Sequence, residues 1–327
     1  MNPRPTRVVA FGGGHGLRAT LRALAALPGD DLRITAVVTV GDDGGSSGRL
    51  RAQRGTLPPG DLRQALAALA APDRHGSSMA ALFQHRFDAG VHPQGEPDGL
   101  AGHPVGNLIL CGLFEMYPDP VAALDEAARM VGARGRVLPM SPHPVGITAD
   151  VRVSSLDGEE PRVETVVGQH AVAITGGHVE AVRLTPANPP ACTDALDAVA
   201  AADWLIFGPG SWYTSVIPHL LVPDLARAIL SSPAARLVIL NLAAEKETSG
   251  LSLSGHLGAL TRYLPGLRAD VVLADGEAVG DPGPLSRAAG SLGARLVLAP
   301  VATGDGTPRH EPAALAAALG PVIGVAG

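Results

Sequence analysis

Lysine is almost absent from this sequence of 327 residues, in which Lys246 is the single lysine among 25 basic residues. A phosphate-binding lysine of the Walker type follows a glycine-rich loop, and no such loop precedes Lys246. The same scarcity confines Schiff-base chemistry to that position. Cysteine is rare too: Cys111 and Cys192 show no CxxC spacing, which excludes a zinc ribbon or a disulfide framework. We expect both to be small buried hydrophobic residues.

Long apolar runs and basic blocks are missing as well. No uninterrupted apolar stretch approaches the roughly 18 residues of a membrane span, and the first predicted strand reaches Gly12 too early for a signal-peptide core. The formal net charge of −6 argues against a nucleic-acid partner. We therefore expect a cytoplasmic protein with no membrane span. Its hydrophobic content of 46% is enough for a sizeable core.

Strand-like and helix-like patterns alternate along most of the chain. A short buried strand (7–11) leads into a glycine loop (12–16) and then into a helix in which Leu17, Leu21 and Leu24 recur at helical spacing. Further strands are predicted over 33–40, 203–207, 236–241, 270–274 and 295–299, and further helices over 193–202, 223–231, 254–264 and 284–292. Such alternation is typical of a parallel sheet. We predict an α/β, Rossmann-like fold with a mostly parallel sheet and helices on both faces.

Residues 136–186 have a different pattern. Ile147, Ala149 and Val151 alternate with polar residues, which is the period of a strand with one solvated face. Asp157-Gly158 and Gly176-Gly177 are hairpin-type turn sequences. We predict an antiparallel β-rich insertion over 136–186, inside a single α/β domain that spans 1–327.

The first candidate site is the glycine loop after the first strand. It comprises Gly12, Gly13, Gly14, His15 and Gly16. A dinucleotide-binding GxGxxG motif counted from Gly12 would need glycine at position 17, where Leu17 stands. The loop could still present backbone amides to a phosphate, and the alternative is a plain tight turn.

The second candidate is a loop after strand 33–40 that contains Asp42, Asp43, Gly44, Gly45, Ser46 and Ser47. Its adjacent carboxylates could bind hydrated Mg²⁺ or a ribose hydroxyl, and its glycines and serines could donate to phosphate. The alternative is an Asx-turn with a helix cap.

The third candidate follows strand 203–207 and contains Gly208, Gly210, Ser211, Trp212, Tyr213, Thr214 and Ser215. Its two aromatic residues suggest a stacking surface for a base or sugar, because aromatics make up only 3% of the chain, and core packing is the alternative. His103 and Asn107 form a fourth candidate at the start of an apolar helix. There Asn107 is either a helix N-cap or a ligand contact, and His103 taken alone would be a solvated loop histidine. No Ser/His/Asp or HExxH arrangement is present, so no catalytic residue is assigned.

These loops together resemble one family. The segments VVAFGGGHGL, ITAVVTVGDDGGSSGRLR, PPGDLRQALAAL, GHPVGNLIL and GPGSWYTSVIPHLLVPDL resemble the YvcK, or gluconeogenesis factor, proteins, which are a branch of the CofD-like superfamily. The resemblance implies a Rossmann-like protein that binds a nucleotide sugar such as UDP-N-acetylglucosamine. It also implies a link to gluconeogenic growth, cell-wall metabolism and cell shape. By the same resemblance, Arg309 would pair with the phosphate.

The sequence departs from the family pattern at several positions. His15 stands where threonine is expected, and Trp212 stands where the pattern has leucine. Ser249 and Gly255 replace two aspartates, so charged roles at these two positions are lost in this chain.

Two functions from different classes follow. The favoured one is a nucleotide-sugar-binding regulatory protein, with regulatory proteins of cell-wall synthesis as partners. The alternative is a Mg²⁺-dependent 2-phospho-L-lactate transferase of the CofD type, with a guanylylated donor, a deazaflavin acceptor and Mg²⁺ held by Asp42 and Asp43. An NAD-dependent dehydrogenase is disfavoured by the failed GxGxxG motif. The sequence leaves open whether any reaction is catalysed and whether the protein forms a homo-oligomer.

Overall fold

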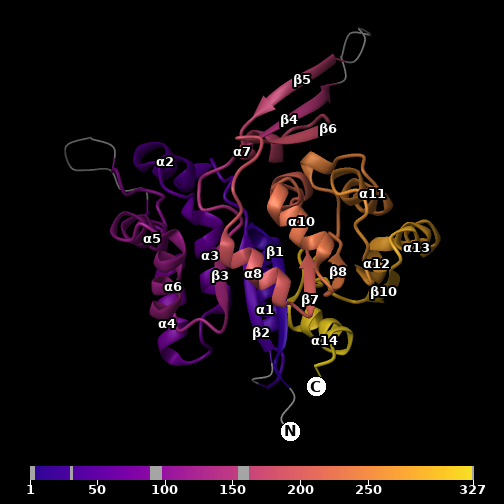
Figure 1. The fold of residues 1–327 in the computed structure, drawn as a ribbon, viewed down its shortest axis with the longest axis horizontal. Helices are drawn as coiled ribbons and strands as arrows, with labels where there is room; N and C mark the ends of the chain where they lie inside the picture. Colours follow the sequence, from indigo (N-terminus) through magenta and orange to yellow (C-terminus); the bar gives the residue numbers. More distant parts are fainter. Residues whose placement is uncertain (1–3, 30–31, 89–97, 154–161, 326–327) are drawn as a thin grey trace.

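A seven-stranded parallel sheet forms the centre of the molecule in the computed structural model, which describes residues 4–29, 32–88, 98–153 and 162–325 (Figure 1). Its strand order is β10-β9-β8-β7-β1-β2-β3, and each neighbouring pair is parallel. The strands are β1 (Thr6–Gly12), β2 (Leu32–Val38), β3 (Arg136–Pro139), β7 (Trp204–Phe207), β8 (Ala235–Ile239), β9 (Val271–Asp275) and β10 (Arg295–Ala299). The predicted α/β fold is confirmed.

The helices begin where the sequence signals them. Pro59 opens α3, the N-cap Asp119 accepts a hydrogen bond from the amide of Val121, and Asp73 caps α4 in the same way. The helices are α1 (Gly14–Ala25), α2 (Gly45–Arg54), α3 (Pro59–Leu69), α4 (Arg74–Gln84), α5 (Val105–Met116), α6 (Pro120–Met130), α7 (Gln169–Ala173), α8 (Thr193–Ala201), α9 (Ile217–Leu220), α10 (Pro223–Ser231), α11 (Leu253–Tyr263), α12 (Gly276–Val279), α13 (Pro282–Ser291) and α14 (Pro312–Ile323). A π-helical turn, η1 (Trp212–Val216), and a 3₁₀ turn, η2 (Lys246–Thr248), complete the set.

The strand order reverses between β1 and β7. The chain moves from β1 to β2 and β3 toward one edge of the sheet, and from β7 to β8, β9 and β10 toward the other. Because parallel crossovers are right-handed, α1 and α10 lie on opposite faces. The rings of Phe11 and Phe207 stack across this junction with centroids 5.0 Å apart. Ligands of open α/β sheets bind beyond the carboxyl ends of the strands at such a reversal.

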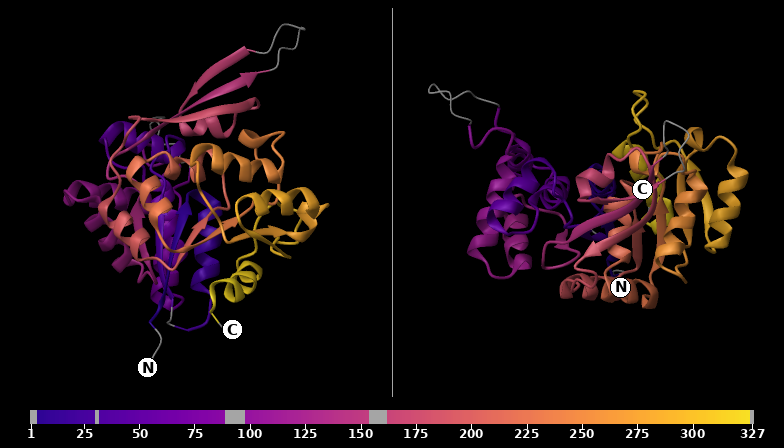
Figure 2. Two further views of the ribbon diagram at one scale, coloured as in Figure 1. Left: turned by 45° about the vertical axis from the view of Figure 1, so that its right-hand side comes forward. Right: turned by 90° about the horizontal axis from the view of Figure 1, so that it is seen from above.

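A separate three-stranded antiparallel sheet projects from the body, at the end of the molecule opposite the two termini (Figures 1 and 2). Its order is β5-β4-β6, from β4 (Gly146–Val153), β5 (Arg162–Val167) and β6 (His178–Thr185). Ile147, Ala149 and Val151 are buried, as the alternation predicted.

The insertion begins later than predicted. Residues Arg136–Pro139 form β3 and pair in parallel with β2 in the main sheet, so the antiparallel segment starts at Gly146 and not at 136. Alternation does not reveal this, because a short buried edge strand of a parallel sheet has no polar face. Gly176-Gly177 lies between α7 and β6 and joins no hairpin, while Asp157-Gly158 lies outside the described residues.

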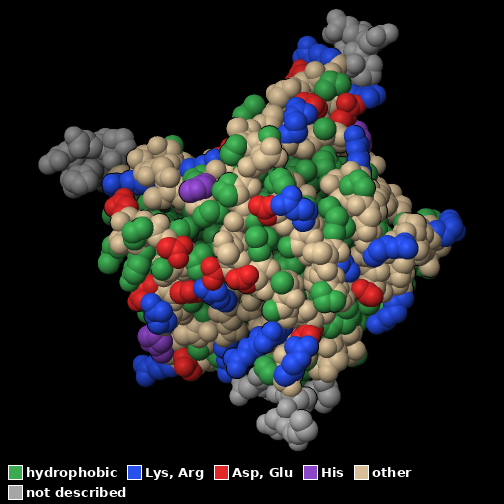
Figure 3. All heavy atoms as spheres, viewed as in Figure 1, with side chains coloured by type: hydrophobic (Ala, Val, Ile, Leu, Met, Phe, Trp, Pro, Cys, Tyr) green, Lys and Arg blue, Asp and Glu red, His purple; other side chains and the backbone are tan. Residues whose placement is uncertain are grey.

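Both cysteines are buried and free, as expected. None of the helices formed by the described residues is long and apolar enough to cross a membrane. Acidic and basic side chains are interspersed on the face of the molecule seen in Figure 3.

Candidate functional site

Two glycine loops meet at the junction of β1 and β7. A methyl group on Gly16, in the first turn of α1, would overlap the backbone carbonyl of Pro209 and lie 2.6 Å from the Cα atom of Gly210. The structure therefore brings the loops after β1 and β7 into backbone contact, where the reversal of strand order predicts a ligand.

Two adjoining cavities open on either side of this contact. The first, about 340 Å³, lies between α1 and the segment after β10, and we call it the arginine-lined cavity. The second, about 420 Å³, lies between the β1 loop, α3, α7 and η1, and we call it the acidic cavity. The two share His15, Gly16, Gly210 and Glu245. Together they form one elongated site.

Positive charge converges on the arginine-lined cavity. Arg18 and Arg22 lie one turn apart on α1, and Arg309 reaches the same cavity from the loop after β10. Among the described residues, no ion pair involves any of these three arginines. The N-terminus of α1, whose first amides lack helical partners, adds partial positive charge. This end of the site is suited to an anion.

Both histidines that line this cavity have a lowered pKa, and burial is the largest cause for each. Partial burial and the neighbouring Arg18 and Arg309 guanidiniums lower the pKa of His15. Burial lowers the pKa of His310 to about 4, and its Nε2 atom has no hydrogen-bond partner among the described residues. Both rings are therefore neutral at pH 7 and leave the arginines as the cations of the cavity.

Three carboxylates line the acidic cavity: Glu245 lies where the two cavities join, and Asp42 and Asp61 belong to the acidic cavity alone. Asp61, near the start of α3, is 8% exposed, and its carboxyl accepts a hydrogen bond from the Gly14 amide. Burial, followed by repulsion from Asp42, raises the pKa of Asp61 to about 7. A Cβ atom on Gly13 would lie 2.5 Å from Asp61 Oδ2, so the close approach of the loop requires glycine there.

The acidic pair is Asp42 with Asp61, not Asp42 with Asp43. Asp42 Oδ1 accepts from the Gly44 amide at 3.0 Å, which is the predicted Asx-turn, and its side chain still lines the cavity. Asp43 Oδ1 instead accepts from the His170 amide at 2.9 Å, so Asp43 joins this loop to α7 outside the cavity. Asp43 therefore does not line the acidic cavity beside Asp42, and its metal role stays a prediction. Within the described ranges, no group of three or more His, Cys, Asp or Glu residues could hold a metal ion.

Ser46, His103 and Asn107 form a buried polar cluster away from both cavities. Ser46 Oγ accepts from Asn107 Nδ2 at 2.9 Å and lies 2.7 Å from His103 Nδ1. The N-cap of α5 is Pro104, so Asn107 is not the cap, and His103, which is 4% exposed, is not a solvated loop residue. These contacts join α2 to α5. The cluster supports the loop and does not line the site.

Trp212 and Tyr213 belong to the core. Trp212 is fully buried, its Nε1 donates to the His256 carbonyl at 2.9 Å, and its ring meets the His256 ring edge to face. Tyr213 is 6% exposed and packs against Tyr263. The predicted stacking surface is therefore wrong at both residues. The π-helical turn η1 directs these rings inward while Thr214 and Ser215 line the acidic cavity.

The predicted residues thus divide into two groups. Lining residues are Gly13, Gly14, His15, Gly16, Asp42, Gly210, Ser211, Thr214, Ser215 and Arg309. Residues that line neither cavity are Gly12, Asp43, Gly44, Gly45, Ser46, Ser47, His103, Asn107, Gly208, Trp212 and Tyr213.

Sequence reasoning missed several lining residues: Arg18, Arg22, Asp61, Gln64, Gln169, His170, Glu245 and His310. A signal existed for Arg18 and Arg22, which repeat at i, i+4 directly after the glycine loop. No sequence signal pointed to Glu245. In the structure its Oε2 accepts a hydrogen bond from Ser211 Oγ at 2.5 Å, where the two cavities meet.

The comparisons with known proteins agree with this geometry. The family model of 2-phospho-L-lactate transferase CofD matches residues 8–286, and the chain belongs to that family. A provisionally named gluconeogenesis factor of Mycobacterium tuberculosis is 50% identical over 316 residues, which cover 95% of this chain and 89% of that protein. The gluconeogenesis factor of Bacillus subtilis is 36% identical over 282 residues, which cover 86% and 82%.

A crystal structure of a member of the UPF0052 family from Bacillus halodurans superposes with a TM-score of 0.82 at 33% identity, and the match covers 97% of this chain and 99% of that one. Within the CofD family, the chain therefore belongs to the gluconeogenesis factors. The resemblance inferred from the loops is confirmed.

Proposed function

We propose that the two adjoining cavities bind a nucleotide sugar of the UDP-N-acetylglucosamine type and that the protein acts through this binding as a regulator. The observation that carries the proposal is the convergence of Arg18, Arg22 and Arg309 on the arginine-lined cavity beside α1, with no ion-pair partner among the described residues. Arg18 is half-buried and Arg22 and Arg309 are exposed, so their guanidiniums can bind an anion from solvent, and a diphosphate supplies two charges in one group.

The ligand then has one orientation. The diphosphate lies in the arginine-lined cavity, beside Gly16 and Gly210 and within its arginine lining. The base occupies the arginine-lined cavity, whose Leu242, Ala243 and Pro308 give it apolar contacts. The sugar extends into the acidic cavity.

Regulation is proposed on the same basis. The gluconeogenesis factor names of the relatives support a link to gluconeogenic growth. We extend the proposal to cell-wall metabolism and cell shape, with the ligand-bound protein recognised by a partner in cell-wall synthesis.

A Mg²⁺-dependent transferase is the second candidate, favoured by the family model and by the Asp42–Asp61 pair. Two carboxylates with water fit the usual protein ligands of Mg²⁺, which would polarise a phosphoryl oxygen when bound. A deazaflavin acceptor would need an aromatic or apolar surface, and no Phe, Tyr or Trp lines either cavity in the described part of the chain. The binding role is therefore preferred.

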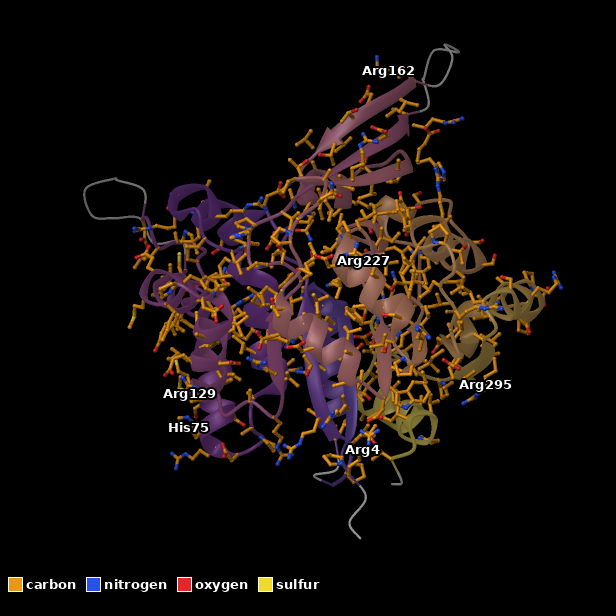
Figure 4. All side chains as sticks on the ribbon, viewed as in Figure 1. Arg4, His75, Arg129, Arg162, Arg227 and Arg295 are labelled. Atoms are coloured by element: carbon orange, nitrogen blue, oxygen red, sulfur yellow. The ribbon has the colours of Figure 1, made fainter. Side chains whose placement is uncertain are left out.

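Replacement of Arg309 tests the proposal. We expect Arg309→Ala to weaken UDP binding about tenfold or more and to change uridine binding much less, because a charge-assisted hydrogen bond to phosphate is lost. Arg295→Ala is the matched control, since Arg295 lies on the far edge of the sheet (Figure 4). Equal losses for UDP and uridine would refute the phosphate role of Arg309.

A further inference from the structure

The acidic cavity is rich in groups that bind hydroxyls and poor in positive charge. Gln64, Gln169, Ser211 and Thr214 line it together with the three carboxylates. Amides and hydroxyls both donate and accept, and carboxylates accept, so a sugar with several hydroxyls finds partners on every side. None of the described residues that line this cavity is an arginine or a lysine.

Arg63 is a buried cation whose charge interacts with Asp61 and Asp42, but its side chain is not part of the cavity lining. Arg63 is 6% exposed, does not line the cavity, and donates through Nη1 to Gln84 Oε1 at 2.9 Å. Asp42 and Asp61 therefore face the ligand space without a guanidinium in front of them. Burial, followed by repulsion from Asp42, raises the pKa of Asp61 to about 7, as expected where negative charge is disfavoured.

We propose that Asp42 and Asp61 make the site selective for charge: it accepts a neutral or amine-bearing sugar and rejects a sugar that carries a carboxylate. The inference rests on the proposed function and specifies which nucleotide sugars the site takes. Its physical basis is that a ligand carboxylate would lie against Asp42 and Asp61, with Glu245 as a third carboxylate of the lining, and that none of the described lining residues is an arginine or lysine. Such like-charge juxtaposition is a general means by which sites discriminate against a wrong ligand.

The test compares three probes on the unmodified protein by calorimetric titration: UDP, UDP-N-acetylglucosamine and UDP-glucuronate. We expect UDP-N-acetylglucosamine to bind more tightly than UDP-glucuronate by about tenfold, or about 1.4 kcal/mol. UDP itself provides the reference for the phosphate and base contacts, and UDP-glucuronate should bind no better than UDP.

Two variants then locate the selectivity. Asp42→Asn keeps an oxygen for the Gly44 amide and removes the charge, so the preference should fall at least threefold, mainly by a gain for UDP-glucuronate. Asp61→Asn should act in the same direction, and it covers the case in which the first variant fails to fold. Asp197→Asn, an exposed position on α8, is the matched control and should leave the preference unchanged.

The outcomes separate the two proposals. Equal binding of the two sugars, or a preference that both aspartate variants leave intact, would overturn the charge selectivity and leave the nucleotide-sugar role standing. Failure of all three probes to bind would overturn the proposed function, and the charge selectivity with it.

Discussion

Gly16 lies directly against the backbone carbonyl of Pro209. The two residues are far apart in sequence, and their contact joins the loop after β1 to the loop after β7. The φ angle of Gly16 is not positive, so its backbone conformation does not require glycine. Glycine is required because a Cβ atom would overlap the backbone of Pro209. Both cavities open beside this contact, so it fixes their relative position.

Gly16→Ala should therefore destabilise the protein and weaken ligand binding. The added methyl group meets backbone atoms, which cannot move aside as a side chain can, and we expect a loss of about 2 kcal/mol or more in the free energy of unfolding. Urea denaturation measures it. Gly258→Ala, on α11 with open space around it, is the control and should be neutral or slightly stabilising. Equal stabilities of the two variants would contradict the backbone contact.

Trp212 should contribute to stability and not to ligand affinity. Because its ring is fully buried and its Nε1 is hydrogen-bonded to the His256 carbonyl, Trp212→Ala should cost about 3–5 kcal/mol of unfolding free energy. Trp212→Phe should cost less, since it keeps most of the ring. Denaturation and titration of both variants separate the roles. A weaker ligand affinity at unchanged stability would return the ring to the binding site.

Asn107 should likewise act through the fold. Asn107→Ala removes the donor to Ser46 Oγ inside a buried cluster, so we expect a loss of about 1–3 kcal/mol in stability. The dissociation constant for the UDP-sugar should change less than about threefold, because Asn107 lines neither cavity. The exposed Asn188 provides the control substitution to Ala. A large loss of affinity with normal melting would show that Asn107 contacts the ligand.

Glu247 should give stability a distinctive pH dependence. Its Oε1 accepts from the Tyr213 amide at 2.8 Å, and burial raises its pKa from 4.5 to about 7. Between these values the unfolded chain releases the proton and the folded chain keeps it, so the contribution of Glu247 to stability falls as the pH rises. Glu247→Gln removes this loss, so its stability relative to the wild type should rise by about 3 kcal/mol between pH 4 and 8.

The comparison of Glu247→Gln with the wild type isolates this group. Asp61 titrates in the same range, and burial lowers the pKa of His219 and His310 to about 4, which acts in the opposite direction. These contributions cancel in the difference between the two proteins. A difference that does not change with pH would show that Glu247 ionises normally.

The location of the site could be predicted from the sequence, because parallel strands all end at the same edge of their sheet. The loops at 12–16, 41–48 and 208–215 each follow a buried strand, and this pattern places them together. The direction of each side chain within the loops could not be predicted. A turn that begins one residue earlier or later would exchange the directions of Asp42 and Asp43, and the same holds for the direction of Trp212.

The sequence also could not predict which residues far apart in the chain meet at the site. Asp61 follows Pro59 in the first turn of α3, and nothing in the local sequence shows that its carboxyl lies against the Gly13–Gly14 backbone. Arg309 was assigned through family resemblance, whereas its meeting with Arg18 and Arg22 depends on the packing of α14 against α1 and on the loop after β10.

The central claim is most directly tested by calorimetric titration of the purified protein with UDP-N-acetylglucosamine, GDP and NAD, each with Mg²⁺ and with a chelator. The account predicts that the UDP-sugar binds, that it binds equally with and without Mg²⁺, and that GDP and NAD bind far more weakly. Binding of GDP that depends on Mg²⁺, with no binding of the UDP-sugar, would contradict the account and favour the transferase.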